Sequence, residues 1–197
     1  MTQKFLILLT VMFANLVGGV NAENFPKASL YELPLTWESE ARESFGLSKF
    51  SGKPVVLSLV YTSCDAVCPL IVNKVKKIYS AVQPNKAHFV LVTMDPEVDM
   101  PEKLKEFKIK NKVDFKNWYF LRTNMGDTRK FSQVLSFSYK KMQGAGHFVH
   151  DNKIFLLNEK GVVVEELVGL ETSEKPIIDF ISSKPTLWQK IKKIFGY

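Results

Sequence analysis

Nearly continuous apolar runs alternate along this chain with segments in which apolar residues recur at helical spacing. The runs are short and rich in β-branched or aromatic residues, which is typical of strands buried on both faces. They predict strands at residues 54–61, 88–94 and 118–121. Apolar residues at helical spacing predict helices at residues 69–82, 101–110 and 127–135.

The end of the apolar pattern predicts a hairpin and a closing helix. Residues 153–168 hold two apolar runs joined by Glu-Lys-Gly, which places Gly161 in the turn. Residues 173–183 form an amphipathic pattern, whereas residues 23–53 contain prolines and turn signals and are expected to be irregular. The order β-α-β-α-β-α-β-β-α predicts an α/β protein with a central mixed sheet flanked by helices. The closing hairpin and helix fit a thioredoxin-like fold.

Two acidic residues mark the start of the second helix. Asp99 and Glu102 have the spacing of a capping box, and Pro101 suits a first helical turn. Asp95, a few residues earlier, lies in the turn that leads there. We therefore expect Asp95 and Asp99 to act as turn and helix-cap residues.

The first 22 residues differ from the rest of the chain. Lys4 precedes an apolar stretch at residues 5–17, and Val-Asn-Ala at residues 20–22 resembles a cleavage site with small residues. This pattern predicts a signal peptide cut after Ala22, with an uncleaved membrane anchor as the alternative, although the stretch is short for a span. Either one predicts that the domain at residues 23–184 is exported, to the periplasm or to the outer face of the cytoplasmic membrane.

The net charge of +7 comes from lysines scattered along the chain. The chain has no arginine-rich stripe and no pattern of alternating basic and aromatic residues. We therefore expect no binding to nucleic acid. Residues 185–197 are the exception, since Trp188 and its apolar neighbours fall on one helical face beside three lysines. This basic amphipathic extension predicts either peripheral contact with an anionic membrane surface or a helix packed on the domain.

Both cysteines of the chain, Cys64 and Cys68, stand between the first predicted strand and the helix that follows it. A disulfide between them would close a very small loop and stabilise the fold little. The positive end of a helix lowers the pKa of nearby thiols, so we expect both thiols to be reactive. They could form a redox pair, or bind a soft ion such as Cu(I) or Zn(II).

Two thiolates leave a metal site open, and a histidine is the natural third ligand. His88 opens a predicted strand and is expected to be an ordinary strand residue, whereas His147 and His150 precede the hairpin. In a thioredoxin-like fold the segment before that hairpin faces the cysteine loop, and a thioredoxin carries a cis-proline there. This chain has no proline between Pro101 and Pro176. His150 is therefore a candidate ligand, an ordinary loop residue being the alternative, and His147 is a second candidate.

Three motifs in sequence order resemble the Sco (SenC) family. They are G-K-P-V-V-L-S-L-V-Y-T-S-C-D-A-V-C-P at residues 52–69, V-T-M-D-P-E-V-D-M-P-E-K-L-K-E-F at residues 92–107, and F-V-H-D-N-K-I-F-L-L-N-E-K-G at residues 148–161. In that family a strand leads into T-x-C-x-x-x-C-P, and a histidine precedes the turn glycine by eleven residues, as His150 precedes Gly161.

The resemblance implies a thioredoxin-like domain that binds copper through Cys64, Cys68 and His150. It implies an exported chaperone that delivers copper to the copper centre of cytochrome c oxidase. The alternative that the family offers is an extracytoplasmic thiol-disulfide oxidoreductase, with Cys64 and Cys68 as its catalytic residues. The implied partner is the copper subunit of the oxidase, or another cuproprotein or thiol protein of the cell envelope.

Overall fold

A computed structural model describes residues 25–83, 85–142 and 147–183 of the 197-residue chain. The predicted leader at residues 1–22 and the predicted extension at residues 185–197 lie outside the described residues, so both stay predictions. Within the described ranges, no helix has the length and apolar character that crossing a membrane requires.

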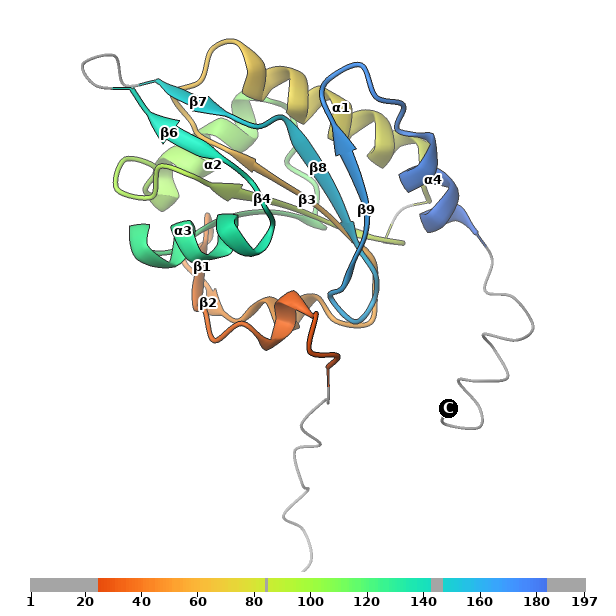
Figure 1. The fold of residues 1–197 in the computed structure, drawn as a ribbon. Coiled ribbons are helices and arrows are strands. Elements are labelled where there is room, and N and C mark those ends of the chain that lie inside the picture. Colours follow the sequence, from red (N-terminus) through yellow and green to blue (C-terminus); the bar gives the residue numbers. More distant parts are fainter. Residues whose placement is uncertain (1–24, 84, 143–146, 184–197) are drawn as a thin grey trace, which may run out of the picture.

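A mixed sheet with the strand order β2-β1-β5-β4-β3-β8-β9 forms the centre of the molecule (Figure 1). Its middle strands β3 (Val55–Val60), β4 (His88–Thr93) and β5 (Trp118–Arg122) are parallel. The hairpin of β8 (Lys153–Leu157) and β9 (Val163–Val168) extends the sheet in antiparallel fashion beside β3. Every residue of β3 is buried, as its nearly continuous apolar run predicts.

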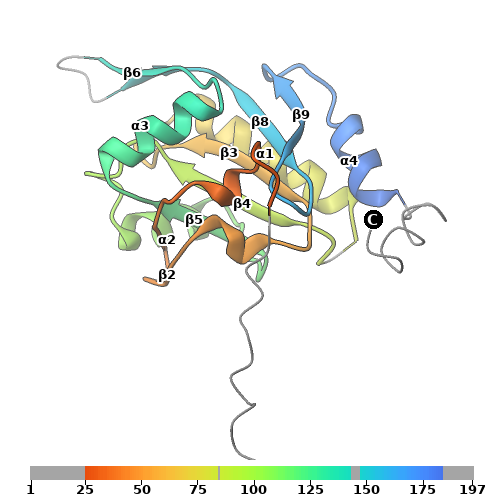
Figure 2. The same cartoon turned by 60° about the horizontal axis from the view of Figure 1, so that its bottom comes forward.

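Among the described residues, four α-helices flank this sheet, as predicted. They are α1 (Val67–Ala81), α2 (Pro101–Lys110), α3 (Met125–Val134) and α4 (Lys175–Ser182). The crossovers from β3 to β4 and from β4 to β5 advance in one direction, so right-handed connections place α1 and α2 on the same face. Helix α3 covers the other face, and α4 packs beside α1 (Figures 1 and 2).

The expectation that residues 23–53 are irregular is wrong in part. This segment contains β1 (Trp37–Ser39) and β2 (Ser44–Phe45), which form one edge of the sheet. Trp37 is fully buried there, and its ring lies 4.8 Å from that of Phe131 on α3. Two or three residues are too few to show a strand period, so only the tertiary contact identifies these strands.

A second, two-stranded sheet was not predicted either. It consists of β6 (Tyr139–Lys141) and β7 (Phe148–His150), which pair antiparallel so that Tyr139 lies opposite His150. Because side chains alternate across a strand, Phe148 and His150 share one face of this hairpin, while residues 147 and 149 point the other way. The hairpin of β6 and β7 therefore sets the direction in which the candidate histidine points.

The turn between β8 and β9 contains Gly161, as predicted, and holds the N-terminal segment of the domain. Gly161 has a φ of +76°, a region that favours glycine. A Cβ atom at this position would lie 2.6 Å from the Tyr31 ring and 2.7 Å from the Ser29 hydroxyl. The Gly161 carbonyl accepts a hydrogen bond of 2.9 Å from the Leu30 N–H. The turn and the N-terminal segment are thus packed with no room for a side chain.

Candidate metal centre

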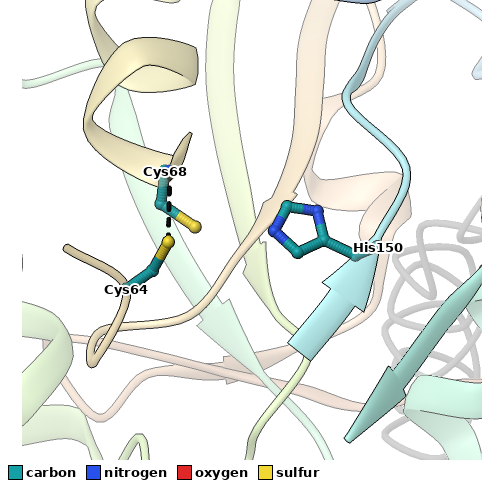
Figure 3. Close-up of side chains that lie close together, drawn as sticks. All are labelled: Cys64, Cys68 and His150. Atoms are coloured by element: carbon teal, nitrogen blue, oxygen red, sulfur yellow. Dashed lines mark hydrogen bonds between the residues drawn. The ribbon is translucent and has the colours of Figure 1, made fainter. Parts of the chain in front are cut away.

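The two cysteines lie where β3 ends and α1 begins, at the carboxyl edge of the parallel strands. Cys68 falls in the first turn of α1, and Cys64 lies in the loop ahead of it. The Cys68 N–H donates a hydrogen bond of 3.3 Å to the Cys64 sulfur (Figure 3). Both are free thiols and both are buried, Cys64 with 6% of its surface exposed and Cys68 with none. The sulfurs are thus fixed relative to each other by the start of the helix.

The imidazole of His150 completes a three-residue group. It comes from the end of β7 and faces the two sulfurs (Figure 3). One ligand atom from each of Cys64, Cys68 and His150 lies within 4.8 Å of the others. The His150 Nδ1 atom is 2.7 Å from the Asp151 carbonyl oxygen. Since a carbonyl only accepts, Nδ1 carries the proton, which leaves the lone pair of Nε2 as the donor for a metal.

The structure separates His150 from the other two histidines. His147 is exposed, lies on the opposite face of the β6–β7 hairpin and is not part of the group. His88 pairs with Val55 at the start of β3, whereas the cysteine loop follows the end of that strand. His88 therefore lies at the opposite end of the parallel strands from the cysteines, as expected of an ordinary strand residue.

Two aromatic side chains lie against the imidazole and a third packs on one of them, and sequence reasoning singled out none of the three. The Tyr61 ring meets His150 edge-on with its centroid 5.9 Å away, and the Phe137 ring lies nearly parallel to the imidazole at 6.2 Å. Phe148 packs on Tyr61 at 4.9 Å, and its N–H donates to the Tyr61 hydroxyl over 3.4 Å. These rings hold the imidazole in place and reduce the access of water to it.

The two thiols differ in acidity. Burial raises the pKa of Cys64, but hydrogen bonds from the Cys68 N–H and thiol, from the Ala66 N–H and from the Tyr61 hydroxyl outweigh it, so the net pKa is lowered. Burial raises the pKa of Cys68 strongly, and the charges of Cys64 and Asp99 add to this rise. The prediction that the helix start lowers the pKa of both thiols is therefore wrong for Cys68, because its complete burial dominates.

Asp99 stabilises the cysteine loop and does not cap α2. Its buried carboxylate accepts hydrogen bonds from the Thr62 N–H at 3.1 Å and from the hydroxyls of Thr62 and Thr93. Helix α2 begins instead after Met100, which provides no side-chain cap. The capping-box prediction is thus wrong, because donors brought near by the fold compete for the carboxylate. Asp99 fixes the backbone two residues before Cys64.

Asp95 helps to position His150, as Asp99 helps to position the cysteine loop. Its carboxylate is 2% exposed, and both oxygens lie 3.0 Å from the ammonium of Lys141 on β6. Lys141 pairs in register with Phe148, two residues before His150. The pair Asp95–Lys141 therefore ties the β6–β7 hairpin to the end of β4, so that Asp95 is more than the turn residue that the sequence predicts.

The fold and this group define a thioredoxin-like α/β protein with a Cys-x3-Cys pair and a histidine at the carboxyl edge of its sheet. The chain matches the family model described as SCO1/SenC over residues 30–183. It belongs to the SCO1/SenC family, as the three sequence motifs predict.

Individual members of the family show the same relationship. The chain is 25% identical to the SCO1 protein homolog of Bacillus subtilis over 164 residues, which cover 80% of this chain and 84% of the homolog. A crystal structure described as a SCO1/SenC family lipoprotein from Bacillus anthracis is 26% identical, with a TM-score of 0.69 over 80% of this chain and 97% of that one. The structure of Bradyrhizobium japonicum ScoI with copper bound superimposes with a TM-score of 0.64 at 19% identity, over 75% of this chain and 94% of that one. The predicted thioredoxin-like fold is thereby confirmed.

Proposed function

We propose that this chain carries one copper ion between Cys64, Cys68 and His150 and delivers it to the copper centre of cytochrome c oxidase. The observation that carries the proposal is the convergence of two sulfurs and one imidazole within 4.8 Å. Family membership supports the destination, because the Sco family is described as one of cytochrome c oxidase assembly proteins. Copper is the cargo in this proposal.

The donor set suits Cu(I). Thiolates and imidazole are soft or intermediate ligands, and thiolates favour Cu(I) over hard cations. Two donors bound to one ion at about 2.0–2.3 Å can be at most about 4.6 Å apart. The observed limit of 4.8 Å between ligand atoms is close to that value, so small side-chain movements are enough to close the site.

Binding of Cu(I) requires that the Cys68 thiol loses its proton. Because burial raises the pKa of Cys68, the ion displaces a proton from this sulfur at neutral pH. The affinity for Cu(I) is therefore expected to fall as the pH is lowered, since protons then compete more strongly for the sulfurs. Transfer proceeds by exchange of these ligands for thiolates of the partner.

The same proposal places the domain outside the cytoplasm. The leader at residues 1–22, removed or kept as an anchor, supports export to the periplasm or to the outer face of the cytoplasmic membrane. The description of the Bacillus anthracis relative as a lipoprotein agrees with such a location. The basic extension at residues 185–197 would add peripheral contact with the membrane, near the oxidase subunit that receives copper.

The unequal acidity of the two thiols favours a second function, that of a thiol-disulfide oxidoreductase. The Cys64 thiolate would attack a substrate disulfide and expel one substrate sulfur as a thiolate. Deprotonated Cys68 would then attack the Cys64 sulfur, releasing the second substrate thiolate and leaving a Cys64–Cys68 disulfide, so that the substrate gains two electrons. The raised pKa of Cys68 slows this second step.

A copper titration tests the proposed function. The reduced full-length protein is mixed under anaerobic conditions with Cu(I) bound to a chromophoric chelator, and transfer of the ion is followed by absorbance. We expect one Cu(I) per chain, and none after both thiols have been alkylated. Failure of the reduced protein to take copper from the chelator, combined with reduction of a model disulfide, would favour the oxidoreductase.

The Asp95–Lys141 pair supplies a second test. Lys141→Met removes the ammonium that holds the hairpin and is expected to weaken Cu(I) binding about tenfold, the range found for residues that orient a ligand. Lys140→Met is the matched control, because residue 140 points to the other face of β6. The same chelator competition measures both, together with thermal unfolding. Equal affinities in the two variants would show that the Asp95–Lys141 pair does not position His150.

A further inference from the structure

Asp151 directly follows the proposed histidine ligand, and the fold holds both its main chain and its side chain. Its carbonyl oxygen lies 2.7 Å from the Nδ1 atom of His150. Its N–H donates a hydrogen bond to the Ser138 carbonyl over 2.9 Å, and its carboxylate accepts one from the Ser138 N–H over 2.8 Å. Asp151 therefore connects the proposed ligand to the segment that leads into β6.

The contacts between Ser138 and Asp151 depart from a regular antiparallel ladder. The register of β6 and β7 places these two residues opposite each other, one step beyond the pair of Tyr139 and His150. In a hydrogen-bonded pair of this kind, each N–H bonds to the main-chain carbonyl of the opposite residue. The Asp151 N–H does so, but the Ser138 N–H donates to the Asp151 carboxylate. The carboxylate thus replaces a main-chain acceptor.

This replacement leaves the Asp151 carbonyl to the imidazole. A second ladder bond would turn the carbonyl towards Ser138, because a carbonyl accepts best when the donor lies near its plane and lone pairs. With the Ser138 N–H bound to the carboxylate, the carbonyl faces Nδ1 of His150 instead. The proton held on Nδ1 leaves Nε2 unprotonated, and Nε2 is then the nitrogen that a metal can bind.

A lysine on β8 anchors the segment that carries the Ser138 N–H. The ammonium of Lys153 donates to the Ser136 carbonyl over 2.9 Å and lies 3.8 Å from the Asp151 carboxylate. Phe137 comes between the two serines, and its ring stacks on the imidazole of the proposed ligand. One anchored segment therefore presents both the competing N–H and the ring that covers the histidine.

We propose that Asp151 is a positioning residue of the copper site: its carboxylate withdraws the Ser138 N–H from the ladder and so keeps the Asp151 carbonyl available to the Nδ1–H of His150. The inference rests on the proposed function, and it adds the group that selects the metal-binding nitrogen. A side chain that only closed the end of the hairpin would affect stability, but it would not determine which ring nitrogen carries the proton.

The position of the ring proton tests this inference without copper. Correlation NMR spectra of the reduced protein with ¹⁵N-labelled histidine distinguish Nδ1–H from Nε2–H, at a mildly alkaline pH where the imidazole is neutral. We expect Nδ1–H in the wild type and in Asp151→Asn, because an amide oxygen still accepts from the Ser138 N–H. In Asp151→Ala we expect the proton to move to Nε2 in a measurable fraction of molecules, since the carbonyl then bonds to Ser138.

Cu(I) competition with a chromophoric chelator measures the consequence for the proposed site. Asp151→Ala is expected to weaken Cu(I) binding about tenfold, as expected for a group that orients a ligand, whereas Asp151→Asn should bind nearly as well as the wild type. Lys153 also lies 2.9 Å from the Glu166 carboxylate, so the lost charge itself should matter little. Asp179→Ala, which removes the same charge from an exposed position on α4, is the matched control. Because 36% of the Asp151 side chain is exposed, the variants are expected to fold, and thermal unfolding checks this.

Two outcomes would overturn the inference. An unchanged ring proton in Asp151→Ala would show that the carbonyl is available to the imidazole without the carboxylate. Equal losses of Cu(I) affinity in the Ala and Asn variants would assign the effect to charge and not to the acceptor. A wild-type chain that takes no Cu(I) would refute copper carriage, whereas a ring proton that moves only in the Ala variant would still establish the role of the carboxylate.

Discussion

Replacing Cys64 or Cys68 by serine is expected to lower the affinity for Cu(I) by more than about 100-fold, beyond the 10- to 100-fold cost of losing a residue that only supports a ligand. Each substitution removes one of the two sulfurs that would share the ion in the proposed site and leaves a hard hydroxyl in its place. Anaerobic competition with a chromophoric chelator measures the loss, and circular dichroism checks the fold. A variant that keeps wild-type affinity would exclude that sulfur as a ligand.

Substitution of His150 tests the third ligand, and His147 provides a control within the same chain. His150→Ala is expected to weaken Cu(I) binding by at least about tenfold, whereas His147→Ala, on the other face of the hairpin, is expected to leave it unchanged. The reverse result would assign the imidazole to His147. If both variants retain copper affinity while disulfide reduction requires Cys64 and Cys68, the oxidoreductase becomes the better description.

Gly161→Ala is expected to be the most destabilising small substitution in the hairpin. A left-handed φ costs a residue with a side chain about 1–2 kcal/mol, and forcing a methyl group into a packed site costs about 1–3 kcal/mol more. The free energy of unfolding, measured by urea denaturation, should therefore fall by about 2–5 kcal/mol.

Gly169→Ala is the matched control for this prediction. Gly169 has a φ of +82°, but an added Cβ would meet no atom within 4 Å. It should therefore show only the backbone cost of about 1–2 kcal/mol. Equal losses at positions 161 and 169 would show that the ring of Tyr31 moves aside, and that the turn is not tightly packed against the N-terminal segment.

The central strands and helices were predictable because their signals are local. The apolar run before Cys64 and the helical spacing after Cys68 lie within one stretch of sequence, so strand, loop and helix could be placed without tertiary information. The strand that contains Trp37 and the hairpin that contains His150 are too short for such a signal. Their conformation depends on partners that the fold supplies.

The site shows the same division between local and tertiary information. The spacing of Cys64 and Cys68 identified the pair of thiols, and the segment before the hairpin identified His150 as a candidate. The role of Asp99 was missed because a local capping rule does not include the distant donors of Thr62 and Thr93. Tyr61, Phe137 and Phe148 come from separate segments, and no spacing between them could have indicated that they meet around an imidazole.

The elements that carry the two sulfurs and the imidazole are attached to the central sheet by different contacts. The sulfurs belong to a helix start that Asp99 fastens to the central sheet, while the imidazole stands on a separate two-stranded arm attached through Lys141 and Tyr61. In the proposed site, two bonds of the ion would be to residues held by the central sheet and one to a residue on a hairpin with fewer contacts to it, and regions with few contacts open more easily. Handover to an acceptor is therefore expected to begin with the bond to nitrogen, which opens a coordination position while both sulfurs still hold the cargo.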